Sequence, residues 1–135
     1  MHGCRPERPN LDRAHARRRD ETVLERITRR SVFAGFAPPA PRYRSSILTL
    51  VVASRAQSDG PGAGLAMAVS RNVGSAVVRN RLRRQLRAAS AELDLVRPWS
   101  DGWYLVIAHR SARGRSFDEL KATLGELLDR AGAKR

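Results

Sequence analysis

The hydrophobic positions of the chain change their period several times, and each period predicts a different element. The clearest repeat lies in residues 76–93, where apolar side chains recur at spacings of four, four, three and four. These are Val78, Leu82, Leu86, Ala89 and Leu93. That spacing places all five on one side of a helix, so the repeat predicts an amphipathic helix with one buried face.

Three shorter apolar runs have the length and composition of buried strands. They cover residues 47–53, 65–70 and 103–108, and the first and third are rich in aliphatic and aromatic side chains. Between the first two runs, residues 58–64 contain three glycines and a proline, which favour turns. The pattern predicts a strand, a flexible loop and a second strand, with the third strand after the amphipathic helix.

Two capping boxes predict the starts of two further helices. Thr22 and Glu25 precede apolar residues at helical spacing, which predicts a first helix over residues 20–37 that ends before Pro38. Ser116 and Glu119 form the second box and open a last helix. The last helix is expected to bury Phe117, Leu120, Leu124, Leu127, Leu128 and Ala131.

The first 19 residues differ in composition from the rest of the chain. They contain six arginines, two prolines and one large aliphatic residue, Leu11. Such a segment cannot bury enough apolar surface to offset the entropy of ordering it. We therefore expect a disordered basic tail over residues 1–19 and one folded domain over residues 20–135.

Charge narrows the class of partner. The 135 residues include 26 Lys and Arg against 13 Asp and Glu, a formal net charge of +13. No acidic residue occurs between Asp59 and Glu92, so the polar side of the amphipathic helix has no local counter-ion. A face that is merely solvated usually carries both signs at four-residue spacing. The charge pattern therefore indicates that the polar side of this helix binds a nucleic acid and is not simply exposed to solvent.

The residues that could perform chemistry are few. Cys4 is the only cysteine, so one chain can form neither a disulfide nor a thiolate zinc cluster, and no apolar run reaches membrane-spanning length. His2, His15 and His109 have no metal-site spacing. The sequence therefore predicts a cytoplasmic protein without catalytic or metal-binding side chains of its own.

Residues 68–87 carry a more specific signal. They read AVSRNVGSAVVRNRLRRQLR and resemble the signature of the bacterial ribonuclease P protein family. The resemblance extends over about residues 22–130. It implies an α+β two-layer sandwich in the order αβββαβα, with a four-stranded mixed sheet and a left-handed βαβ crossover. This fold is shared with the second domain of a small-subunit ribosomal protein.

The family resemblance also implies a function. Ribonuclease P proteins are subunits of an endoribonuclease that removes the 5′ leader of precursor tRNA. The resemblance implies that catalysis resides in the RNA subunit and that Mg²⁺ in the holoenzyme is held mainly by RNA. The expected partners are one ribonuclease P RNA per protein and precursor tRNA, with neither a membrane nor an obligate protein partner.

Two sets of site residues follow from the resemblance. Those expected to bind the catalytic RNA are Ser70, Arg71, Arg79, Asn80, Arg81, Arg83, Arg84 and Arg87. Those expected to bind the single-stranded leader are Arg30, Phe33, Phe36, Arg42, Tyr43 and Arg44. The aromatic residues of the second set have an alternative interpretation, because phenylalanines at helical spacing often belong to a core.

Two other functional classes share the charge pattern. One is a structural RNA-binding protein, such as a ribosomal protein, on the same scaffold. The other is a DNA-binding regulator with the amphipathic helix in a major groove, which requires a preceding short helix and a tight turn. Here a predicted strand and Gly74 precede the helix, which disfavours the second class.

Overall fold

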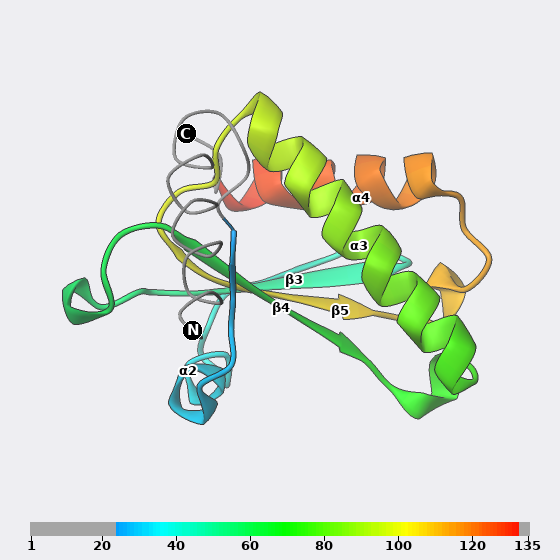
Figure 1. Ribbon diagram of the computed structural model, residues 1–135, viewed down its shortest axis with the longest axis horizontal. Helices are drawn as coiled ribbons and strands as arrows, with labels where there is room; N and C mark the ends of the chain where they lie inside the picture. Colours follow the sequence, from blue (N-terminus) through cyan, green and yellow to red (C-terminus); the bar gives the residue numbers. More distant parts are fainter. Residues whose placement is uncertain (1–23, 133–135) are drawn as a thin grey trace, which may run out of the picture.

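The computed structural model describes residues 24–132, which form one mixed β-sheet with helices packed on it (Figure 1). The sheet has five strands in the order β1-β4-β5-β3-β2. The strands are β1 (Glu25–Arg26), β2 (Arg42–Arg44), β3 (Leu48–Ala53), β4 (Ala63–Val69) and β5 (Gly102–Ala108). The helices are α2 (Arg30–Ala34), α3 (Ala76–Val96) and α4 (Phe117–Ala131), with short 3-10 turns η1 (Gln57–Asp59), η2 (Arg71–Val73) and η3 (Arg110–Ala112). The tail expected over residues 1–19 lies outside the described residues.

The main core lies between one face of the sheet and the helices α3 and α4. Alternate residues of the central strands point into it, among them Leu50 of β3, Leu65 of β4 and Val106 of β5. Leu82 and Leu86 of α3 meet them from the helix layer, as the sequence predicted. The amphipathic period of α3 therefore places its polar side outward.

The last helix begins where its sequence predicted. The Ser116 hydroxyl accepts a hydrogen bond from the Glu119 backbone N–H at 3.1 Å, and the Glu119 carboxylate accepts one from the Ser116 N–H at 3.0 Å. This confirms the capping box. The leucines of α4 are fully buried, whereas Phe117 and Ala131 are half-buried.

A smaller core covers the opposite face of the sheet. It is formed by Ile27, Val32, Phe36, Val51, Ala53, Ala66 and Trp103. The segment around α2 supplies three of these residues and covers only part of the face (Figure 1). The remaining surface includes Ala68, which is exposed, and Ile107, which is half-buried.

The prediction of a first helix over residues 20–37 is wrong for most of its described part. Residues 25 and 26 pair in parallel with Gly64 and Leu65 as an edge strand, and only residues 30–34 are helical. A helix would place Leu24 and Ile27, three residues apart, on one face. In the extended chain Leu24 packs against the main core and Ile27 enters the smaller core on the other side of the sheet. Two separate burial sites thus favour the strand.

The overall class of fold is confirmed. From α2 onward the elements follow the order αβββαβα, with β4 and β5 as parallel neighbours on either side of α3 in the chain. Strand β1 is an addition, so the sheet has five strands where the resemblance implied four. The connection through α3 brings the arginine-rich helix to the surface beside β4.

Candidate nucleic-acid interface

Helix α3 is fixed to the domain at its start and along its apolar face. The Ser75 hydroxyl caps the helix by accepting a hydrogen bond from the Val78 N–H at 3.3 Å. Gly74 precedes the cap, and a Cβ there would lie 2.9 Å from the Val78 side chain. Leu82, Leu86 and Ala89 are buried. These contacts hold the opposite side of α3 toward solvent.

The solvent side of α3 carries the predicted arginines. Arg81 and Arg84 are exposed, and Arg79, Arg83 and Arg87 are half-buried. Within the described residues, none of the five forms an ion pair with a carboxylate. Two of them donate hydrogen bonds to neutral acceptors. Arg79 Nε donates to the Gly74 carbonyl at 3.3 Å, and Arg83 donates to the Asn80 side chain at 3.0 Å.

The four ion pairs among residues 24–132 lie elsewhere. They join Arg29 to Asp59, Arg55 to Glu25, Arg115 to Glu119 and Lys121 to Glu92. Glu92 of α3 pairs with Lys121, and Glu119 of α4 pairs with Arg115, so neither carboxylate neutralises an arginine of α3. The arginine side of α3 is a positively charged surface whose counter-charge must come from outside the described part of the chain.

Arg26 extends this surface in a way that the sequence did not predict. The pKa of Arg87 is lowered from its ordinary value, mainly because the Arg87 side chain is partly buried and also because of the positive charge of Arg26. The pairing of β1 with β4 at the edge of the sheet places Arg26 near enough to Arg87 for the two charges to interact. A bound anion would relieve the repulsion between these two guanidinium groups.

The turn before α3 continues the charged surface. Ser70, Arg71 and Asn72 are exposed, and the Ser70 hydroxyl is hydrogen-bonded to the Asn72 side chain. Val73 is buried and anchors the turn to the core. The structure thus brings all eight residues of the first predicted set onto α3 and the turn that leads into it.

The second predicted set is brought together only in part. Phe33 is 41% exposed and its ring meets the ring of Phe36 edge-on at 6.1 Å, but Phe36 is buried in the smaller core. Arg42 donates a hydrogen bond to the Phe36 carbonyl at 3.2 Å, which ties β2 to the α2 segment. Arg30 and Arg44 are exposed.

Tyr43 does not belong to this surface. It pairs with Leu50 in the register of β2 and β3, and it packs against the main core on the helix side of the sheet. Its neighbours Arg42 and Arg44 pair with Val51 and Thr49 and point to the opposite face. The prediction that Tyr43 lines a common cleft with Phe33 is therefore wrong.

Comparison with known proteins identifies the family. The family model of ribonuclease P matches residues 23–132, which is most of the chain. The chain belongs to the ribonuclease P protein family. The ribonuclease P protein component of Gluconacetobacter diazotrophicus is 32% identical over 123 residues, covering 91% of this chain and 96% of that protein.

Other relatives of the ribonuclease P family match over a shorter stretch. The protein component of Shouchella clausii is 44% identical over 68 residues, which are 50% of this chain and about half, 54%, of that relative. Among solved structures, the ribonuclease P protein of Staphylococcus aureus matches with a TM-score of 0.72 at 18% identity. The match covers 84% of this chain and 100% of the Staphylococcus aureus chain. The ribonuclease P protein of Thermotoga maritima has a TM-score of 0.68 at 21% identity, covering 78% and 96%. At these identities the structural matches establish the fold.

Two further properties of this ribonuclease P family member concern residues 24–132. No helix among them has the length and hydropathy needed to span a bilayer. In the same range, no three His, Cys, Asp or Glu side chains lie close enough together to bind a metal ion. His109 instead shares a hydrogen bond of 2.7 Å with the Thr49 hydroxyl.

Proposed function

We propose that this chain is the protein subunit of ribonuclease P and that α3 binds the catalytic RNA. The observation that carries the proposal is the arginine side of α3, which has no carboxylate partner among the described residues. Guanidinium groups suit this partner because folded RNA is recognised largely through phosphates, 2′-hydroxyls and shape. Ser70, Arg71 and Asn80 add donors at the same surface.

We place hydrolysis of the precursor tRNA on the RNA subunit. Five clustered guanidinium groups attract phosphates and repel Mg²⁺, which binds to oxygen ligands. In this proposal Mg²⁺ is held mainly by RNA, and the protein strengthens the binding of substrate and metal by reducing repulsion between phosphates. The expected stoichiometry is one protein per RNA.

A second surface is proposed for the 5′ leader. Phe33 is the large aromatic side chain left exposed near α2, and stacking of a base on it is sequence-tolerant. Arg30, Arg42 and Arg44 lie on the same segment or on the sheet edge beside it and can hold leader phosphates. Phe36 supports this surface from within the core, and Tyr43 has no part in it.

Reconstitution tests the proposal. The full chain is mixed with a bacterial ribonuclease P RNA at low Mg²⁺, and cleavage of precursor tRNA is measured with and without protein. Stimulation of cleavage at the mature 5′ end is expected. Tight RNA binding without stimulation would instead indicate a structural RNA-binding protein, and preference for a duplex DNA sequence would indicate a regulator; either result refutes the proposal.

A further inference from the structure

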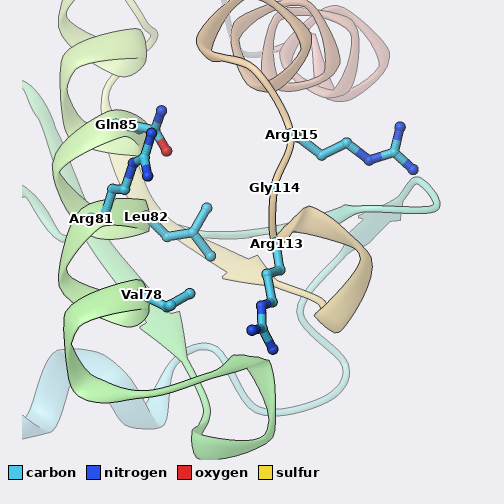
Figure 2. Close-up of a pocket in the computed structure, with 7 residues that line it drawn as sticks. All are labelled: Val78, Arg81, Leu82, Gln85, Arg113, Gly114 and Arg115. Carbon is cyan, nitrogen blue, oxygen red and sulfur yellow. The ribbon is translucent and has the colours of Figure 1, made fainter.

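A cavity of about 350 Å³ lies between the first half of α3 and the segment that follows η3 (Figure 2). Its lining combines two chemistries. Val78 and Leu82 form an apolar wall on α3, and the polar groups come from both sides of the cavity. These polar residues are Arg81 and Gln85 on α3, and Arg113 and Arg115 on the segment before α4.

The topology of the sheet creates this cavity. Strands β4 and β5 run in parallel and end in register, with Val69 opposite Ala108. Each strand continues into a 3-10 turn that starts with an arginine, Arg71 in η2 and Arg110 in η3, and these two turns pack against each other. The chain after η3 therefore passes beside the start of α3. The carboxyl ends of neighbouring parallel strands are a common place for ligands to bind.

The charges at the cavity are only partly compensated. Arg115 is bound to Glu119 at 3.3 Å and to the Ser111 carbonyl at 3.0 Å, and its side chain points away from α3 in Figure 2. Arg81 and Arg113 are exposed and have no carboxylate partner within residues 24–132. Two guanidinium groups at the cavity are thus available to an anionic ligand.

Gln85 distinguishes this site from a simple phosphate-binding surface. Its side chain is half-buried at the cavity, and its amide has no hydrogen-bond partner among the other described side chains or backbone groups. An amide offers both a donor and an acceptor, as the edge of a nucleobase does. Val78 and Leu82 provide an apolar surface that suits the face of a base and not a free phosphate.

We propose that this cavity binds one unpaired nucleotide of the RNA that occupies α3. The base lies against Val78 and Leu82 with its edge toward the Gln85 amide, and Arg81 and Arg113 hold the adjoining phosphates. The volume is at the lower end of about 300–1,000 Å³ for small-ligand pockets, which fits one nucleotide. This inference rests on the proposed function, because the surrounding RNA supplies most of the binding energy.

Three variants test the site in the full chain with a bacterial ribonuclease P RNA. Gln85→Leu keeps size and charge and leaves the base edge without its hydrogen-bond partner. We expect RNA affinity to fall about 5- to 100-fold, without a change in salt dependence. Arg113→Ala should also weaken binding and lower the log–log salt slope by about 0.7–0.9. Arg97→Ala is the control, because it removes one exposed arginine just after the end of α3, outside the cavity. Its RNA affinity should stay within about twofold of that of the unsubstituted protein.

Chemical probing of the RNA bases gives a second readout. In the complex with the unsubstituted protein, one unpaired base should be protected from a base-specific reagent, and the same base should regain reactivity with Gln85→Leu. If Gln85→Leu matches the unsubstituted protein in affinity and protection while precursor-tRNA cleavage is still stimulated, the nucleotide site is refuted and the proposed function stands. If the unsubstituted protein neither binds the RNA nor stimulates cleavage, both are refuted.

Discussion

Replacement of Arg55 by methionine should destabilise the domain by about 3 kcal/mol. The side chain is only 6% exposed, and its guanidinium donates to the carbonyls of Asp59 and Gly60 and to the Glu25 carboxylate, each at 2.8 Å. It also lies 4.2 Å from the centre of the Trp103 ring. Arg55 therefore ties η1 and the edge strand β1 to β5 through one charged group.

The magnitude follows from these contacts. A hydrogen bond from a charged group contributes about 1.5–3 kcal/mol, and a cation–π contact about 1 kcal/mol. The acceptor residues Asp59, Gly60 and Glu25 are partly accessible, so water replaces some of the lost bonds, which brings the expected total to about 3 kcal/mol. Methionine retains an apolar stem over Trp103, so loss of packing adds little.

Urea unfolding followed by far-ultraviolet circular dichroism measures this loss. Arg29→Met is the matched control, because Arg29 also lies near Trp103, at 5.8 Å, but is 54% exposed and makes one ion pair, with Asp59. Its replacement should cost less than about 1 kcal/mol. Equal losses for the two variants, or a loss below about 1 kcal/mol for Arg55→Met, would refute the reasoning.

Three further outcomes are expected. Gly64→Ala should destabilise the domain by about 3 kcal/mol in urea unfolding, because its Cβ would lie 2.4 Å from Trp103 ring atoms; an unchanged midpoint would contradict this close packing. Hydrogen bonding from the Ser116 backbone, aided by Arg115, lowers the pKa of Glu119 in the folded protein. The ionised Glu119 carboxylate therefore stabilises the fold above the unfolded pKa of about 4.3, and this stabilisation is lost as pH falls through the folded pKa. Thermal melts of Glu119→Gln should therefore lose less stability on acidification than the unsubstituted protein, and an identical acid profile would count against this. Arg26→Gln should stabilise the free protein by about 0.5 kcal/mol, as seen in urea unfolding, and weaken its RNA binding; a destabilised protein would show that Arg26 and Arg87 do not repel each other.

The elements that the sequence predicted well are the two long helices whose local signal is supported by burial against the main core. The stripe of α3 and the capping box of α4 each combine a local signal with burial against the main core. The first helix failed because the spacing of Leu24 and Ile27 also suits an extended chain that serves two cores. Only the position of β1 beside β4 decides between them, and that pairing is not encoded locally.

The part of the candidate site that lies on one helix could be predicted from the sequence, and the part that depends on strand pairing could not. The arginines of α3 follow from one helix, so its period placed them correctly. Arg26 and Arg113 join that surface because β1 pairs with β4 and β4 pairs with β5. These pairings join segments that are distant in the sequence, so no local pattern reveals them. Tyr43 was misplaced because the face of a three-residue strand depends on its register with β3.

The salt dependence of RNA binding tests the role of α3 most directly. The binding constant for a bacterial ribonuclease P RNA is measured over a range of salt concentrations for the unsubstituted protein and for Arg79→Ala with Arg81→Ala. Loss of two phosphate contacts should lower the magnitude of the slope of log binding constant against log salt concentration by roughly 1.4–1.8. The control pair Arg97→Ala with Arg130→Ala should leave this slope unchanged. An unchanged slope for the α3 variant, or an equal fall in the control, would contradict the account.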